Sequence, residues 1–217
     1  MKTNYSTITD EVKQVIEEIE KNDVVFKKIE KYYKGVQILF SNLIHKPKIM
    51  LIGINPGDGY FKQKGERVKK FEPEKKLEYS YPYYKYPLAL NTRKLYELAG
   101  CTEYLENSVK TNCFFLATNT EKELYQMLSY LKEYKLYKKS DIWINKLIEI
   151  IEPEIIICEG KSAFDRVIKN KDCEKIIYKH YCYAKYKNID IIGYRRIRSS
   201  IKHINEVANL LKEKVNK

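Results

Sequence analysis

Short apolar runs that alternate with amphipathic segments are the feature of this sequence that most restricts its fold. We predict strands at 48–54, 110–117, 154–158, 176–183 and 189–193. Helical periodicity is present at 9–21, 24–43, 88–98, 121–132, 141–151, 160–168 and 201–215. Since strands that alternate with helices pack as βαβ units, we predict an α/β protein. The expected architecture is a three-layer α/β/α sandwich around a central, mainly parallel sheet of about four to five strands.

Residues at the ends of these elements support the assignment. Thr9 precedes an apolar helical face and is the expected N-cap of the first helix. Gly100 follows the helix at 88–98 and should end it. The strands at 176–183 and 189–193 are close in sequence, so we expect them to form an antiparallel hairpin at the sheet edge.

The chain contains neither an internal repeat nor a Pro/Gly-rich linker, so we expect a single, monomeric domain spanning 1–217. It has an N-terminal helical part at 1–45 and an irregular, tyrosine-rich loop at 58–86. Long loops of this kind are either functional or mobile, and both interpretations stay open here. No run reaches the roughly 18 to 20 apolar residues that span a bilayer. Residues 1–10 lack the apolar core of a signal peptide, so we expect a cytoplasmic protein without membrane contact.

The net charge of +12, from 41 basic and 29 acidic residues, favours a polyanionic partner such as DNA. Codon bias in an AT-rich genome is the competing explanation for the lysine excess. The arginines are more informative, because three of the six fall within 195–198. Arginine is the better phosphate-binding residue, so this cluster favours nucleic-acid contact.

A Pro/Gly turn follows the strand at 48–54: Gly53-Ile54-Asn55-Pro56-Gly57-Asp58. Ligands of open α/β sheets bind beyond the carboxyl ends of the strands, where this turn lies. Two other polar segments, 110–112 and 194–203, should reach the same edge. The Asn55 amide can orient a water molecule but cannot remove its proton. An ordinary strand-exit turn is the alternative interpretation.

The segment Gly53-Ile54-Asn55-Pro56-Gly57 after an apolar strand resembles motif one of the uracil-DNA glycosylase superfamily. The similarity is greatest to its mismatch-specific uracil/thymine and single-strand-selective branches. Segments 84–100, 110–112 and 155–163 resemble later parts of the family pattern, in the same order, and the resemblance covers 48–215. It implies a uracil-DNA glycosylase-like fold. It also implies a monofunctional enzyme that hydrolyses the N-glycosidic bond of uracil, or another altered pyrimidine, flipped out of DNA, and leaves an abasic site.

The resemblance also implies roles for individual residues. Asn55 would align the attacking water at the sugar C1′, and Asn112 would bind the edge of the extruded base. Backbone amides near Asp58 and Gly59 would hold a base oxygen, while Asp58 itself is either a second catalytic group or a turn former. An aromatic ring would stack on the base, with Tyr84 the best-aligned candidate. The remaining expected substrate contacts are Gly53, Ile54, Pro56, Gly57 and Tyr60.

The last loop departs from the family pattern, in which a His-Pro-Ser motif follows the final strand. Here no histidine precedes the serines of 193–203. We expect this loop to bind DNA, with a serine capping the final helix, or else to be a basic surface loop. The DNA-binding candidates are Arg195, Arg196, Arg198, Ser199, Ser200 and His203.

Neither a metal nor a cofactor is expected, because hydrolysis by water needs none and the five cysteines lack paired spacing. The expected partner is DNA, double- or single-stranded. Two other functions stay open: a glycosylase for bulky modified bases of foreign (phage) DNA, and a catalytically silent DNA-binding member of the fold. A nucleotide-binding enzyme is disfavoured, because Gly160-Lys161-Ser162 matches only the tail of a phosphate-binding loop.

Overall fold

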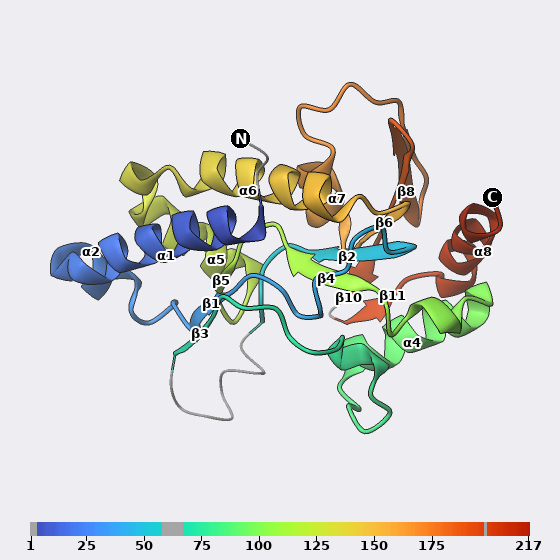
Figure 1. Cartoon of the computed structure of the whole chain (residues 1–217), viewed down its shortest axis with the longest axis horizontal. Coiled ribbons are helices and arrows are strands. Elements are labelled where there is room, and N and C mark those ends of the chain that lie inside the picture. Colours follow the sequence, from blue (N-terminus) through green and yellow to red (C-terminus); the bar gives the residue numbers. More distant parts are fainter. Residues whose placement is uncertain (1–3, 58–66, 198) are drawn as a thin grey trace.

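The computed structural model describes residues 4–57, 67–197 and 199–217 (Figure 1). A six-stranded sheet in the order β4-β2-β6-β9-β8-β7 forms its centre. Four neighbouring strands are parallel, and β8 and β7 continue the sheet with antiparallel pairings. Their bounds are β2 Ile49–Gly53, β4 Val109–Asn112, β6 Ile155–Cys158, β7 Lys175–Ile177, β8 Tyr181–Tyr186 and β9 Ile189–Tyr194. The α/β prediction with a mostly parallel sheet is confirmed, and the sheet is larger than expected.

Helices cover both faces of this sheet because each central strand is apolar on both sides. In β2, Met50 and Ile52 contact one hydrophobic cluster, whereas Ile49 and Leu51 contact another. Figure 1 shows α1, α6 and α7 on the first face and α4 and α8 on the second. The helices are α1 Tyr5–Lys21, α2 Asp23–Ile29, α4 Pro87–Ala99, α5 Glu121–Tyr130, α6 Leu136–Ile151, α7 Lys161–Val167 and α8 Ile204–Val215.

A smaller sheet, in the order β3-β1-β5, lies beside the central one. It comprises β1 Gly35–Gln37, β3 Val68–Lys70 and β5 Leu116–Ala117. The prediction of one helix over 24–43 is therefore wrong. The helix ends at Ile29, Gly35 has a φ of 130°, and Val36 to Leu39 are all buried, which a one-sided helix cannot achieve.

Three other boundary predictions need correction. Asn4, rather than Thr9, caps α1, and the buried Thr9 hydroxyl donates to the Tyr5 carbonyl at 3.1 Å. The run at 110–117 divides between β4 and β5, which belong to different sheets. The run at 176–183 divides between β7 and β8, so the edge strand is β7. By contrast, Gly100 ends α4 in the left-handed conformation, as predicted.

The shorter elements complete the described chain. They are the 3₁₀ helices η1 Glu78–Ser80, η2 Thr102–Tyr104 and η3 Lys132–Tyr134, and the strands β10 Arg196–Ile197 and β11 Ser200–Ile201. Strands β10 and β11 pair as a small antiparallel hairpin between β9 and α8. Among the described residues, no helix has the length and apolar character needed to cross a bilayer.

Candidate functional site

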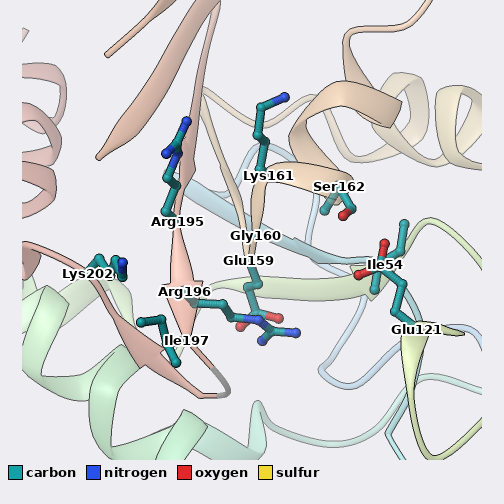
Figure 2. Close-up of a pocket in the computed structure, with 11 residues that line it drawn as sticks. Ile54, Glu121, Glu159, Gly160, Lys161, Ser162, Arg195, Arg196, Ile197 and Lys202 are labelled. Carbon is teal, nitrogen blue, oxygen red and sulfur yellow. The ribbon is translucent and has the colours of Figure 1, made fainter. Parts of the chain in front are cut away.

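A cavity of about 470 Å³ opens at the carboxyl ends of the parallel strands (Figure 2). Its walls come from the ends of β2 and β6, the start of α7, the first residue of α5, residues 195–197 and Lys202. Ligand-binding pockets commonly have volumes of about 300–1,000 Å³. The cavity therefore has the size and the place in the sheet that a small-molecule or nucleotide site requires.

A buried ion pair adjoins this cavity through Glu159, one of its lining residues. Lys110 of β4 pairs with Glu159, which follows β6, and their side chains are 7% and 2% exposed. Lys110 Nζ also lies 4.6 Å from the centre of the Tyr79 ring. Burial lowers the pKa of Lys110, and the neighbouring carboxylate opposes that effect. The ion pair thus holds one carboxylate oxygen of Glu159, Oε2, in place.

The second oxygen of Glu159, Oε1, is buried and lacks a hydrogen-bond partner among the described residues. Glu159 lines the cavity, and the buried Tyr79 hydroxyl also interacts with its carboxylate. An unsatisfied carboxylate oxygen is unfavourable in a buried position, which marks it as a functional candidate.

Gly53 allows the polar groups of neighbouring strands to come together. It pairs in register with Asn112 on one side, and Glu159 follows Cys158, the partner of Ile52, on the other. A Cβ atom at Gly53 would overlap Asn112 Oδ1 and lie 3.3 Å from Glu159 Oε2. Glycine is required here by the close approach of these side chains.

Basic side chains line the cavity above Glu159: Lys161, Arg195, Arg196 and Lys202. Figure 2 shows the Arg196 guanidinium extending over the Glu159 carboxylate, with Glu121 across the cavity. Backbone hydrogen bonds hold the Arg195 segment, because Arg195 N donates to the His180 carbonyl at 3.0 Å and Lys202 N donates to the Arg195 carbonyl at 2.9 Å. The arrangement suits an anionic ligand, such as a phosphate.

Asn55 lies at the turn after β2 but does not line the cavity. Its Nδ2 donates to the Pro56 carbonyl at 2.9 Å and to Thr118 Oγ1 at 3.0 Å. These bonds fix the turn and occupy the amide donor. The role of Asn55 in aligning water stays a prediction.

The other residues predicted around this loop are only partly brought together. Ile54 lines the cavity, and Asn112 is buried beside Gly53 and near Glu159. Pro56 is buried in the turn, whereas Gly57 is exposed. Three of the predicted site residues, Asp58, Gly59 and Tyr60, lie outside the described residues.

Tyr84 lines a different cavity, of about 330 Å³, together with Gln37, Phe40, Tyr81 and Tyr83. It is half-buried, and its ring centre lies 4.7 Å from that of Tyr83. The structure therefore does not place Tyr84 in the cavity that contains Glu159. Its role in stacking on an extruded base stays a prediction.

The basic loop contributes to the site mainly through its first residues. Arg195 and Arg196 line the cavity, Ser199 and Ser200 lie in the turn and second strand of the β10–β11 hairpin, and Arg198 is outside the described residues. Neither serine caps the final helix. His203 takes the N-cap position of α8, with a φ of 50° and no side-chain capping bond.

One group in the described part of the chain has side chains placed for metal binding. The ligand atoms of His180, His203 and Glu206 lie within 4.8 Å of one another. The two imidazoles stack with centres 3.4 Å apart, and His203 Nδ1 is 3.2 Å from Glu206. The group is on the surface and outside the cavity lining.

The sequence interpretation missed the Lys110–Glu159 pair and the contributions of Lys161 and Lys202. A signal was present, because Lys110 is a charged residue next to Val109 in a predicted strand and Glu159 directly follows the apolar strand β6. Buried charges are almost always paired, so each called for a partner. Comparison with protein-family models and with curated protein sequences finds no match. The geometry of the site must therefore support any functional conclusion.

Proposed function

We propose that this protein is a DNA glycosylase of uracil-DNA glycosylase-like fold, which hydrolyses the N-glycosidic bond of uracil or another altered pyrimidine. The observation that carries the proposal is the close approach of Asn112 and Glu159 around Gly53 at the carboxyl ends of the parallel strands, where Glu159 lines a cavity with a basic rim. The resemblance of Gly53 to Gly57 to motif one of that superfamily supports the same conclusion.

The fold supports this proposal at a coarse level. A mostly parallel sheet with helices on both faces agrees with the three-layer sandwich that the resemblance implies. The motif-one turn follows β2, in the middle of the parallel strands, and β4 with Asn112 is its direct neighbour. The turn and the amide are thus at the edge where such sheets bind ligands.

The charge of the cavity supports DNA as the substrate. Four basic side chains line it against two acidic ones, Glu121 and Glu159, and the whole chain carries +12. Phosphate contacts from such groups position a nucleic-acid backbone without reading its sequence. The reacting nucleotide must leave the base stack, because its glycosidic carbon is inaccessible inside a duplex.

In the proposed reaction, a water oxygen attacks C1′ and the bond from C1′ to the base nitrogen breaks. The bonding electron pair leaves with the base, and the water proton passes to a carboxylate or to solvent. Glu159 is the carboxylate proposed to hold that water, since it lines the cavity and Lys110 pairs with only one of its oxygens. The negative charge of Glu159 also stabilises the positive charge that develops on the sugar.

The direct test is incubation with oligonucleotides that contain uracil or mismatched thymine, followed by alkaline cleavage at abasic sites. Wild-type protein should produce strand breaks, and Glu159→Gln should lower the rate at least about 100-fold. Glu97→Gln, on an exposed face of α4, is the matched control. The double variant Lys110→Met/Glu159→Gln keeps the buried site neutral, so its inactivity cannot be attributed to an unpaired lysine.

Two outcomes would change the proposal. Cleavage of strands containing bulky modified bases, but not uracil, would favour a role against foreign DNA, and mass spectrometry of the released base would identify the substrate. Salt-dependent DNA binding without base release across such a panel would leave a DNA-binding protein without catalysis. Asn55→Ala tests the other candidate water-holding residue: it should lower the rate and leave DNA affinity unchanged if Asn55 aligns the water, and it should lower both if Asn55 only fixes the turn.

A further inference from the structure

The second cavity, of about 330 Å³, has an aromatic wall. Ring centres are 5.2 Å apart for Tyr81 and Tyr83 and 4.7 Å apart for Tyr83 and Tyr84, with interplanar angles of 32° and 39°. Tyr83 is 66% exposed, which is unusual for a large ring that already contacts two others. The wall therefore presents an open aromatic face to any planar group that enters.

The side chain of Gln37 forms a fixed polar point in the same cavity. Gln37 is 2% exposed and lies in β1, which pairs with β3 on one side and β5 on the other. Its Nε2 donates to the Leu39 carbonyl at 3.0 Å, whereas Oε1 has no hydrogen-bond partner among the described residues. A flipped amide would set Oε1 against the Leu39 carbonyl oxygen, so the acceptor orientation is determined by chemistry.

The charges around the cavity favour a neutral ligand. Its lining contains two lysines, Lys75 and Lys76, and two glutamates, Glu74 and Glu78. Lys76 pairs with Glu106, and Glu74 pairs with Lys70. Burial raises the pKa of Glu78, which also favours a neutral environment. A phosphate or carboxylate would find little net attraction here, whereas a planar ring with an N–H group would fit both the aromatic wall and the amide.

We propose that this cavity binds an unpaired nucleobase of single-stranded DNA, which stacks on the tyrosine wall and donates an N–H to Gln37 Oε1. The choice of DNA as the ligand rests on the proposed function. Every nucleobase has a π-face, and stacking on aromatic side chains is tolerant of sequence. One acceptor distinguishes a base from an abasic sugar but does not select one base.

The two cavities are neighbours across Lys110. Its ammonium pairs with Glu159, which lines the first cavity, and lies 6.0 Å from the centre of the Phe40 ring, which lines the second. One strand can thus place its reacting nucleotide in the first cavity and a nearby base in the second. This gives the protein a preference for DNA that is unpaired around the reacting position.

The test is fluorescence anisotropy of labelled single-stranded oligonucleotides at fixed salt concentration. Tyr83→Ala should weaken binding about 5- to 100-fold, and Tyr83→Phe should leave it nearly unchanged, since stacking needs only the ring. Gln37→Leu should weaken binding as well. Tyr130→Ala, at a 41% exposed tyrosine of α5, is the control for loss of a surface ring. Because Tyr83 is exposed, its variants test the inference even if Gln37→Leu fails to fold.

The outcomes separate this inference from the proposed function. Equal affinity of wild type, Tyr83→Ala and Tyr130→Ala would overturn the nucleobase site, even with base excision intact. No binding of any strand by the wild type would overturn it too. Weaker binding by Tyr83→Ala, together with no base release by the wild type, would support the nucleobase site and rule out the proposed glycosylase activity. An oligomer of abasic sugars should bind wild type and Tyr83→Ala equally.

Discussion

The two faces of the central sheet differ in what they bury near the carboxyl ends of the strands. The face covered by α1, α6 and α7 is apolar there, with Ile52, Ile54 and Cys158 in one cluster. The face covered by α4 and α8 carries Lys110 and Glu159 at the same level. Buried charge lowers stability relative to an apolar pair of the same shape. The Lys110–Glu159 pair carries that penalty beside the cavity, whereas the ion pair between α6 and α7 on the other face, Arg166–Asp141, is less completely buried, with side chains 8% and 20% exposed.

Removing one partner of the ion pair should produce the largest effect. Glu159→Ala leaves the Lys110 ammonium buried without a counter-charge, and we expect a loss of about 3–5 kcal/mol in the free energy of unfolding. Lys110→Met/Glu159→Leu should recover most of that loss while abolishing activity. Urea denaturation measures both. A loss below about 1 kcal/mol for Glu159→Ala would mean that the polar face is more hydrated than the structure indicates.

A substitution that creates a cavity on the apolar face should lower the free energy of unfolding by a similar or smaller amount, without a functional change. Ile156→Ala removes a fully buried side chain from β6, and we expect a loss of about 2–5 kcal/mol. Ile142→Ala, at a 42% exposed position of α6, is the matched control. DNA affinity below the unfolding transition should stay that of the wild type. A marked loss of affinity would show that the two faces are coupled.

Charge removal at the cavity rim should act on binding and leave stability almost unchanged. Arg196→Ala should reduce the slope of log affinity against log salt by about 0.7–0.9, if Arg196 contacts one phosphate. Lys27→Ala on the exposed side of α2 is the control. Anisotropy titrations at several salt concentrations measure the slope. An unchanged slope would place the DNA backbone away from this rim.

The smallest expected effect is a loss of stability at alkaline pH, caused by a buried thiol on the apolar face. Burial raises the pKa of the Cys113 thiol from 9.0 to about 12. Its contribution to stability is therefore fully present below pH 9 and is lost as pH rises towards 12. Unfolding at pH 8, 9 and 10 should show the start of that decline, which Cys113→Ala should reduce.

At pH 8, alkylation should reach half-buried Cys173 before Cys113, and mass spectrometry of labelled peptides tests this order.

Local sequence patterns predicted the elements whose signals lie within a few residues. Strand β6 is a short apolar run, Ile155–Cys158, flanked by Glu154 and Glu159, and its predicted and observed bounds agree closely. Helix α4 was predicted within one residue at each end, because Gly100 can adopt the left-handed backbone that ends it. Strand β1 escaped prediction, because its partners β3 and β5 are distant in sequence.

The sequence by itself determined the α/β class, the place of the Pro/Gly turn from Gly53 to Gly57 after a buried strand, and the basic character of the loop after β9. These follow from apolar periodicity, Pro/Gly chemistry and charge, all of which are local. Only the tertiary structure decided that Lys110 pairs with Glu159, 49 residues away in the sequence. The pair lies beside Gly53, where a side chain would clash with the neighbouring polar groups. It also decided that Tyr84 and Gln37 line the same second cavity. Such meetings depend on the order and register of strands, which no local pattern contains.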